Sequence, residues 1–380
     1  DIYMKLRKLP LYASKIFANS LSLICSKKLR NRIKHIIKLS QACSYPRMGD
    51  GFMLPSLQTN VLESSHKNYG GGVIERCKFL YFFDTKKLEF IIEHILNDEY
   101  SKNLYLSAVI NQISNYKGFL IVLFYDRIWH KYKDLALAKS HQKISSTLSE
   151  LYLFDLSKIN IADIRLYYVE PGIFNQFVLQ QYKYRDIVFA QNGDYVIDGG
   201  ACYGETTLYF SHLVGKNGKV FSFEFMEQNI EIFHKNMALN PQCDNITLVK
   251  RPLYVDSNTF VSFSGGGSSA TIIADKQNKQ DITFQTISID DFVEQNKIPK
   301  IDFIKFDIEG AELNALKGGV KSIKKFRPKL AICLYHSCAD YVDIPLFLHE
   351  LLTDYEFYFD HFTLGRYESI LFARPKPQNA

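Results

Sequence analysis

The fold is decided by one stretch of the chain, residues 194–207, which reads DYVIDGGACYGETT. Its first five residues, 194–198, carry the β-branched and aromatic side chains of a buried strand. Three glycines follow, at a point where the backbone of a strand-to-helix turn can approach a ligand closely and direct amide groups at it. A helical pattern then runs over residues 205–214. The stretch therefore predicts a strand, a ligand-binding turn and a helix.

Four further β-rich runs follow, at residues 219–224, 245–250, 301–307 and 329–335. Helical patterns lie between the strands, at residues 205–214, 229–239 and 311–317. This alternation is typical of crossover units that build a parallel sheet. The runs at residues 355–359 and 369–373 are joined by a loop too short for a crossover helix, so we expect an antiparallel pair there. A glycine triplet between residues 260–263 and 270–273 predicts a hairpin.

The first part of the chain has a different pattern. Between residues 86 and 113, apolar side chains recur at helical spacing in two runs that meet near residues 97–98. We therefore predict two domains: a mainly helical one over residues 1–165 and an α/β domain over residues 166–380.

The composition excludes two classes of protein. Of the 380 residues, 47% are hydrophobic and 23% are charged, which are values of a folded protein and not of a disordered one. The longest apolar run, residues 119–125, is far shorter than the ~20 residues that a membrane-spanning helix needs. Seven cysteines without a C-x-x-C pair favour a reducing compartment, so we expect a cytoplasmic protein without a leader peptide. Abundant Lys, Ile and Asn indicate a bacterial, AT-rich genome.

Positive charge is concentrated at the start of the chain. Residues 1–47 hold eleven Lys and Arg and one acidic residue, so this tail carries a net charge of +10 and the rest of the chain carries −4. Apolar residues at helical spacing between the cations predict a basic amphipathic helix or helix pair. We favour packing on the body with a solvated cationic face, and contact with a membrane surface or an acidic partner is the alternative. Nucleic-acid binding is not expected, because no zinc-finger or RNA-binding motif accompanies the charge.

The glycine turn has the chemistry of a ligand site. Its spacing from Gly200 to Gly204 is G-x-x-x-G, with Asp198 two residues before it, and this departs from the G-x-G-x-x-G pattern that binds dinucleotide pyrophosphates. A carboxylate at the turn suits a cationic ligand such as the sulfonium of S-adenosylmethionine. Glu224, at the end of the second strand, lies where such folds place an acid that accepts hydrogen bonds from ribose hydroxyls. These residues indicate an adenosyl ligand, and a tight structural turn is the alternative.

Charged residues also cluster where the fourth strand ends, at residues 305–312, which read KFDIEGAE. The carboxyl ends of strands face the ligand crevice in open α/β sheets. Because this strand is hydrophobic enough to be central, we expect Lys305 and Asp307 to have partners or a function. We assign a function to Asp307 and Glu309. For Glu312 we favour a structural place at a helix N-terminus, and a structural ion pair is the alternative for Lys305.

The fifth strand is followed by His336, which therefore belongs to the same edge of the sheet. Its titration near neutral pH suits a group that takes a proton from an acceptor hydroxyl, and a structural histidine bonded to a neighbouring loop is the alternative. Ser337 and Asp340 have the spacing of a capping box for the next helix. His361 is a weaker candidate base. No cluster has the spacing of zinc ligands, so no metal is expected.

These segments resemble the FkbM family of S-adenosylmethionine-dependent methyltransferases. The matching stretches are residues 196–207, 223–225, 301–318, 335–336 and 367–373. The resemblance implies a Rossmann-like class I methyltransferase sheet of seven strands with the last one antiparallel. It also implies methyl transfer to a hydroxyl oxygen, often on a sugar or a natural product. The cofactor residues that follow from the turn and the resemblance are Asp198, Gly199, Gly200, Ala201, Gly204, Thr206, Glu224 and Asp307.

One departure from the family pattern follows the second strand, where the usual Glu-Pro is replaced by Glu224 and Phe225. We nevertheless expect an O-methyltransferase that acts on a sugar, a glycan such as a surface polysaccharide, or a glycosylated natural product. An alcohol is a weak nucleophile, so the reaction needs alignment and a base.

In this hypothesis His336 is the base, Asp307 and Glu309 orient the hydroxyl, and Lys305 positions Asp307 or the substrate. A divalent metal on Asp307 and Glu309 is a less favoured variant. Two other classes remain open: a non-catalytic module that binds an adenosyl ligand or a partner, and a nicotinamide-dependent oxidoreductase.

Overall fold

A computed structural model describes residues 26–42, 85–114, 135–147, 149–264, 271–273, 283–363 and 365–377. The chain divides into two compact units. The smaller unit consists of Asp1–Trp129 and Phe359–Ser369, and the larger one of His130–Tyr358 and Ile370–Ala380. The two units are described separately below.

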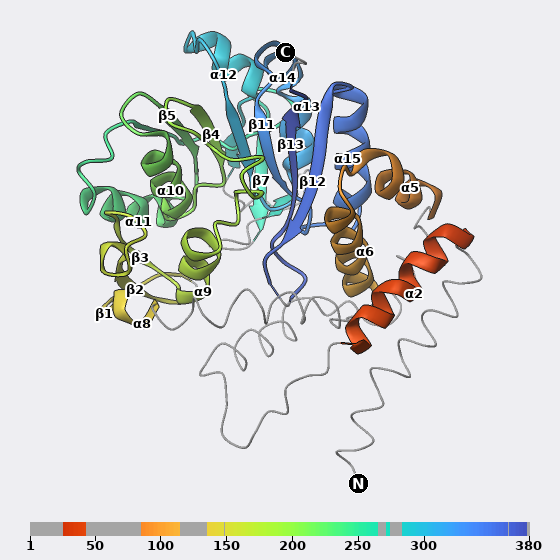
Figure 1. Cartoon of the computed structure of the whole chain (residues 1–380). Coiled ribbons are helices and arrows are strands. Elements are labelled where there is room, and N and C mark those ends of the chain that lie inside the picture. Colours follow the sequence, from red (N-terminus) through yellow and green to blue (C-terminus); the bar gives the residue numbers. More distant parts are fainter. Residues whose placement is uncertain are drawn as a thin grey trace, which may run out of the picture. The chain divides into compact units, whose positions relative to one another are not determined.

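The larger unit is built on a seven-stranded sheet (Figure 1), to which residues 359–361 and 369 of the smaller unit also contribute. The strands are β4 Tyr195–Gly199, β5 Lys219–Phe223, β6 Ile246–Val249, β10 Phe303–Phe306, β11 Lys329–Cys333, β12 Tyr355–His361 and β13 Ser369–Pro375. Their order is β12-β13-β11-β10-β4-β5-β6. The strands from β6 to β11 pair in parallel, and β13 is antiparallel to β11. This is the class I sheet that the sequence predicts, and the five predicted parallel strands are confirmed.

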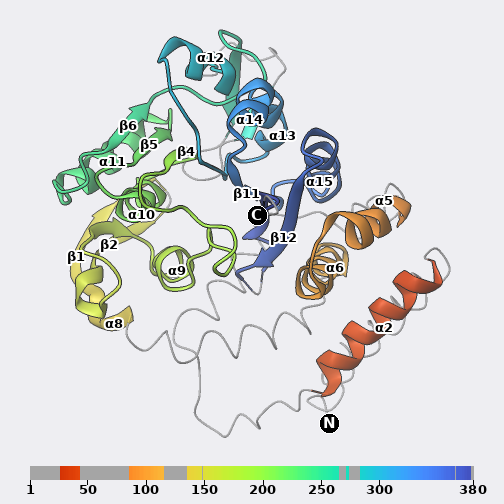
Figure 2. The same ribbon diagram turned by 45° about the horizontal axis from the view of Figure 1, so that its top comes forward.

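Helices cover both faces of the sheet. They are α10 Glu205–Val214, α11 Glu227–Ala238, α12 Ile289–Gln295, α13 Glu312–Lys317, α14 Val320–Phe326 and α15 Asp340–Leu351. Phe210 of α10 packs on Phe303 of β10, whereas Phe292 of α12 packs on Phe223 of β5. Phe303 lies beside Val196 in the sheet, and Val196 lies beside Val220, so their side chains point to the same face. Phe223 is three positions after Val220 on β5, and because side chains alternate along a strand it points to the other face. The two helices therefore lie on opposite faces, as Figure 2 shows.

Strands also occur where the sequence predicts helices. The larger unit contains a three-stranded antiparallel sheet of β1 Lys139–Ser145, β2 Glu150–Asp155 and β3 Arg165–Tyr168. Short helices flank it, namely α8 Leu135–Ala138, η2 Leu156–Ile159, α9 Glu170–Ile173 and η3 Phe174–Val178. Leu151 of this sheet packs with Tyr203 and Ile232. The division near residue 165 is thus wrong for the described residues, because strands from residue 139 onward belong to the α/β unit.

A further small sheet joins β7 Phe260–Ser264, β8 Thr271–Ile273 and β9 Thr283–Gln285. The predicted hairpin is confirmed by the antiparallel pairing of β7 with β8, and its glycine triplet lies outside the described residues. β9, which pairs with β7, is an addition that the sequence did not indicate.

The described parts of the smaller unit up to residue 114 are helical. It contains α2 Lys27–Ala42, α5 Thr85–Phe90, the π-helix η1 Ile91–Ile95 and α6 Glu99–Ser114, which confirms the two helical runs between residues 86 and 113. Leu29 and Ile33 of α2 are buried. Arg32 of the same helix forms ion pairs with Glu93 and Glu99 at 3.2 and 2.7 Å. The basic amphipathic helix is confirmed over α2, with part of its charge paired to the unit's own acids, and the rest of the tail lies outside the described residues.

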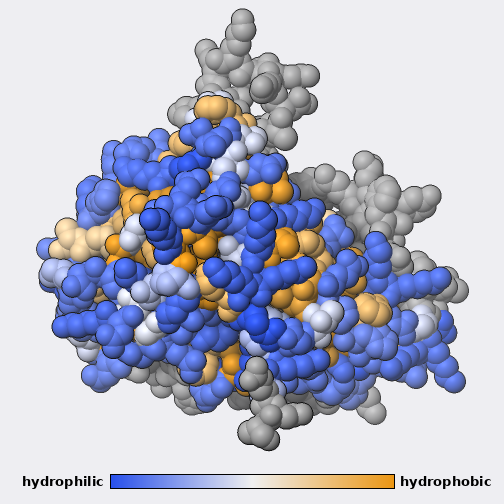
Figure 3. Space-filling model, turned by 90° about the horizontal axis from the view of Figure 1, so that it is seen from above, coloured by the Kyte–Doolittle hydropathy of each residue, from blue (hydrophilic) through white to orange (hydrophobic). Residues whose placement is uncertain are grey.

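The space-filling view in Figure 3, seen from above relative to Figure 1, shows hydrophilic side chains over most of the visible surface, with smaller groups of hydrophobic ones between them. Among the described residues, no helix combines the length and the apolar character that crossing a bilayer requires.

Candidate active site

The glycine turn lies against the segment that follows β10. Gly200 has a φ of +78°, and a Cβ atom there would lie 1.8 Å from the backbone oxygen of Asp307. The backbone N–H of Asp307 in turn donates to the oxygen of Gly199 at 3.2 Å. Only glycine allows both the left-handed backbone and this close approach. The turn and the charged end of β10 therefore form one continuous site.

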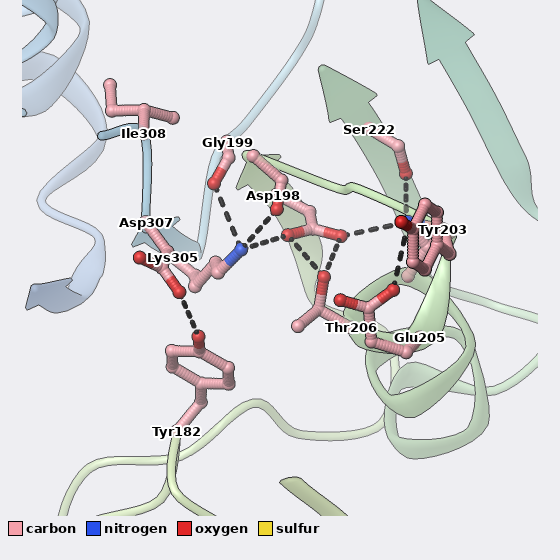
Figure 4. A network of polar contacts seen from close by, with 12 residues as sticks. Tyr182, Asp198, Gly199, Tyr203, Glu205, Thr206, Ser222, Lys305, Asp307 and Ile308 are labelled. Atoms are coloured by element: carbon pink, nitrogen blue, oxygen red, sulfur yellow. Dashed lines mark hydrogen bonds and ion pairs between the residues drawn. The ribbon is translucent and has the colours of Figure 1, made fainter. Parts of the chain in front are cut away.

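A buried ion pair supports the turn from inside the domain (Figure 4). Lys305 and Asp198 are register partners on β10 and β4, both are fully buried, and Lys305 Nζ lies 3.1 Å from Asp198 Oδ1. The ammonium also donates to the backbone oxygens of Gly199 and Gly200 at 3.0 and 2.8 Å. Burial lowers the pKa of Lys305, but the carboxylates of Asp198 and Asp307 outweigh burial and raise it above its usual value. Lys305 therefore remains charged and fixes the turn.

The other bonds of Asp198 go to the start of α10. The Thr206 hydroxyl lies 3.0 and 2.8 Å from the two carboxylate oxygens, and the Thr207 hydroxyl donates to Oδ2 at 2.8 Å. Asp198 and Thr206, two of the predicted cofactor residues, therefore contact each other. Both side chains are buried, so they shape the turn from inside the protein. Ala201 is fully buried as well, and Gly204, the N-cap of α10, has a φ of +85°. Lys305 likewise has no access to a substrate, so the substrate-positioning role considered for it does not fit.

Glu224 lies at the end of β5, as predicted. It is nearly buried, and its oxygens accept the backbone N–H groups of Phe225 and Met226 at 2.7 and 2.8 Å and the Asn229 amide at 3.1 Å. Burial raises its pKa. A proline at position 225 would lack the first of these donors, so the departure from Glu-Pro adds a hydrogen bond. A carboxylate offers about four acceptor positions, so Glu224 has capacity for a ribose hydroxyl.

The residues present therefore fit an adenosyl cofactor. The glycine turn gives a close backbone approach, and Glu224 supplies a fixed acceptor 24 residues further along the chain.

A second buried acid in the turn was missed by the sequence analysis. Glu205 is the first residue of α10, its side chain is buried, and Oε2 accepts the backbone N–H of Tyr203 at 3.0 Å. Burial raises the pKa of Glu205 to about 7. The signal was available in the sequence, because a carboxylate that follows a ligand-binding glycine has little room for solvent.

Beyond β10 the structure gathers four carboxyl groups around one histidine, and we call Asp307, Glu309, Glu312, His336 and Asp340 the acidic cluster. The carboxylate of Asp307 accepts hydrogen bonds from the Tyr182 and Tyr335 hydroxyls at 3.0 and 2.7 Å. Burial would raise the pKa of Asp307, but the nearby charges of His336 and Lys305 and the hydrogen bond from Tyr335 hold it well below its usual range. Each oxygen of Asp307 therefore accepts one protein hydrogen bond and keeps one further acceptor position.

His336 lies between carboxylates on both sides. Its Nδ1 is 2.9 Å from Glu312 Oε1, and its Nε2 is 3.3 Å from Asp307 Oδ1 and 3.6 Å from Glu309 Oε2. Burial lowers the pKa of His336, but Glu312 and Asp307 outweigh it and raise the pKa well above 6.5. Both ring nitrogens face carboxylates of the protein. The base role predicted for His336 does not fit this arrangement, which makes it a positioning residue instead.

Glu309 is the most accessible carboxyl group of those around His336. Its side chain is 27% exposed, against 21% for Asp307 and none for Glu312, and its backbone has a φ of +56°. Burial raises the pKa of Glu309 to about 7. Of the two residues predicted to orient an acceptor hydroxyl, Glu309 is therefore the more accessible.

The remaining predictions in this region have mixed outcomes. Glu312 is the first residue of α13 and accepts the Ile308 backbone N–H at 2.8 Å, as expected for a helix start, but its contact with His336 was missed. Asp340 accepts the Ser337 backbone N–H at 2.8 Å, which confirms half of the expected capping box. Burial and the charge of Glu312 raise the pKa of Asp340 to about 7. His361 belongs to the smaller unit, where its Nδ1 lies 2.7 Å from Ser369 Oγ.

The strand order and the position of the turn define a class I methyltransferase fold. Residues 198–357 match the model of the methyltransferase FkbM domain. This stretch is therefore an FkbM methyltransferase domain, which confirms the resemblance drawn from the sequence and supports S-adenosylmethionine as the cofactor. The match favours the methyltransferase interpretation over the nicotinamide-dependent one.

The matches among solved structures include several methyltransferases. The chain is 20% identical to methyltransferase FkbM from Methylobacillus flagellatus, with a TM-score of 0.47, and the match covers 76% of this chain and 58% of that one. A putative rRNA-methylase from Clostridium thermocellum is 15% identical, with a TM-score of 0.35 and coverage of 53% and 97%. The O-methyltransferase from Bacillus cereus, solved with S-adenosylhomocysteine, is 16% identical, with a TM-score of 0.32 and coverage of 48% and 74%. No similar sequence was found among curated proteins.

Proposed function

We propose that this protein is an S-adenosylmethionine-dependent O-methyltransferase that methylates a hydroxyl of a sugar, a glycan or a glycosylated acceptor. The observation that carries the proposal is the direct contact between the glycine turn and the acidic cluster, where a Cβ at Gly200 would overlap the backbone oxygen of Asp307. The groups that hold the cofactor and those that handle the acceptor thus share one stretch of backbone.

The cofactor supplies an electrophilic methyl group on a sulfonium. The protein must then align an alcohol oxygen with that methyl carbon and remove the hydroxyl proton, so that the new carbon–oxygen bond forms as the carbon–sulfur bond breaks and S-adenosylhomocysteine leaves. Glu309 takes this proton on a carboxylate oxygen, because it is the accessible member of the acidic cluster. Asp307 and His336 hold the segment around Glu309 in place through their mutual contact at 3.3 Å.

The acidic cluster also favours an acceptor with several hydroxyl groups. Ionised carboxylates are acceptors only, so they pair with the O–H donors of a sugar and not with carbonyl or phosphate oxygens. Tyr335 adds an aromatic ring at the same edge, next to Asp307. A polyhydroxylated acceptor therefore satisfies the cluster better than an anionic one.

The test is transfer of a radiolabelled methyl group from S-adenosylmethionine to a panel of free sugars, oligosaccharides and glycosylated small molecules. The proposal predicts label on a sugar oxygen, located by fragmentation mass spectrometry. Matched deoxy-sugars that lack the methylated hydroxyl should accept no label. Label on nitrogen or carbon, or no transfer to any acceptor by protein that binds S-adenosylhomocysteine, would contradict it and favour another acceptor class or a non-catalytic module.

A further inference from the structure

Three side chains of the acidic cluster converge on one point. Asp307, Glu312 and His336 each offer one ligand atom, and these atoms all lie within 4.8 Å of one another. They come from the residue after β10, the first residue of α13 and the segment after β11. Segments far apart in the sequence thus bring two carboxylates and an imidazole together at the carboxyl edge of the sheet.

A second observation concerns the polar atoms inside this group. Glu312 is fully buried, yet among the described residues its Oε2 has no hydrogen-bond partner. The His336 side chain is 5% exposed, and its ring nitrogens approach carboxylates without the alignment of a hydrogen bond. Buried polar atoms that lack well-formed bonds are costly, usually by about 1–3 kcal/mol each. These atoms therefore point to a partner that is not a neighbouring side chain.

We propose that Asp307, Glu312 and His336 bind a divalent transition-metal ion. Carboxylate oxygens suit Mn²⁺, and an imidazole nitrogen suits Zn²⁺ and Fe²⁺, so this mixed set favours Mn²⁺ or Zn²⁺ over Mg²⁺ or Ca²⁺. An ion here balances the charge of the buried Glu312 carboxylate and the partly exposed Asp307 carboxylate. It differs from the metal variant considered from the sequence, which used Glu309 in place of Glu312 and His336.

Three protein ligands leave coordination positions for other oxygens, as catalytic metal sites do. Because the site adjoins Glu309, the ion can hold the acceptor hydroxyl while Glu309 removes its proton. This role in methyl transfer rests on the proposed function, whereas metal binding itself does not.

A proton offers the competing explanation. An imidazolium at His336 can hold the same carboxylates at the same distances without any ion. Measurements of metal binding separate the two, because a site closed by a proton has no affinity for Mn²⁺ beyond that of the protein surface.

The experiment titrates the full chain, stripped with chelator, with MnCl₂ and follows the loss of the free Mn²⁺ signal by electron paramagnetic resonance. The proposal predicts one ion per chain and a rise in the thermal midpoint on binding. Glu312→Gln, which retains an acceptor for the Ile308 N–H, and His336→Gln should each weaken binding by about tenfold or more. Glu309→Gln is the matched control from the same cluster and should bind as wild type does. Competition with ZnCl₂ then ranks the two ions.

Absence of stoichiometric binding by folded wild-type protein would overturn the proposal and leave the proton as the explanation. Equal binding by wild type and by both ligand variants would overturn it too, since the ion would then lie elsewhere. Titration with S-adenosylhomocysteine keeps the two proposals distinguishable, because a protein that binds Mn²⁺ but no cofactor would contradict the proposed function alone.

Discussion

Lys305 and Asp307 lie on either side of Phe306 in the sequence, and they belong to two groups of charged residues with different environments. Lys305 and Asp198 are completely buried, and backbone oxygens and two threonine hydroxyls complete their contacts. The acidic cluster around His336 is partly exposed and retains buried atoms without hydrogen bonds among the described residues. The comparison shows that the two groups have different roles. The buried pair of Lys305 and Asp198 fixes the shape of the glycine turn, whereas the acidic cluster retains capacity for ligands.

Removal of the inward charge should have the largest effect on stability. Lys305→Met would leave the buried Asp198 carboxylate without its counter-ion, which costs about 3–5 kcal/mol. Urea unfolding measures the loss. Lys300→Met is the control, since Lys300 pairs with Asp302 at 2.8 Å but its side chain is 45% exposed, and such pairs contribute at most about 1 kcal/mol. Similar losses for both variants would show that the inward pair is not the support of the turn.

The pH dependence of stability should show that Glu205, like Asp198, is a buried part of the glycine turn. Its pKa is raised to about 7 in the folded protein, so the folded state binds more protons than the unfolded state between pH 4.5 and 7. Stability therefore falls as the pH rises through this window and levels off above it. Glu205→Gln removes this loss, and its advantage over wild type should grow by about 3 kcal/mol from pH 4 to pH 8.

Unfolding curves of the two proteins at several pH values give this difference directly. Because Glu309 and Asp340 titrate in both, their contribution cancels in the comparison. If the difference in free energy of unfolding between the two proteins stayed constant from pH 4 to pH 8, the pKa of Glu205 would not be raised by burial in the folded protein.

Two glycines with the same backbone conformation test the turn itself. Gly193 has a φ of +86° with nothing near its missing Cβ, whereas Gly200 combines a φ of +78° with overlap of Asp307. Gly193→Ala should cost about 1–2 kcal/mol from the backbone alone. Gly200→Ala should cost about 1–3 kcal/mol more, because a backbone oxygen must move. Equal losses in urea unfolding would show that the turn and Asp307 are not in contact.

Glu309 should show the smallest change in stability and a large change in rate. Glu309→Gln keeps the size of a partly exposed side chain, so the free energy of unfolding should change by less than about 1 kcal/mol. Loss of the proton acceptor should lower turnover by about 10²–10⁴-fold. Steady-state assays with an acceptor from the sugar panel measure this. Turnover near the wild-type value would assign the proton transfer to another group.

Much of the fold was predictable because hydrophobic periodicity is local. The strands β4, β5 and β10 are short, mostly buried runs that end at a glycine or are followed directly by a charged residue. The sheet of β1 to β3 was missed for a tertiary reason. The side chains of Asn236 on α11 and of Asn240, just beyond its end, bond to the backbone of β3 at residues 167 and 165, and so take the place of a neighbouring strand. No pattern within residues 139–168 indicates a partner some 70 residues away.

The site was predictable in its members but not in their contacts. The sequence brought Asp307, Glu309 and His336 to one edge of the sheet. It did not show that Glu312 approaches His336 from 24 residues away, and this contact is what removes the imidazole from the role of base. Side-chain partners depend on helix and loop positions, which periodicity does not define.

The central claim is that the glycine turn beside Asp307 binds the cofactor, and calorimetric titration with S-adenosylhomocysteine tests it most directly. The account predicts that wild type and Gly193→Ala bind with micromolar affinity, whereas Gly200→Ala, measured under conditions in which it is folded, loses binding. Failure of the folded wild type to bind, or unchanged binding by Gly200→Ala, would contradict the claim.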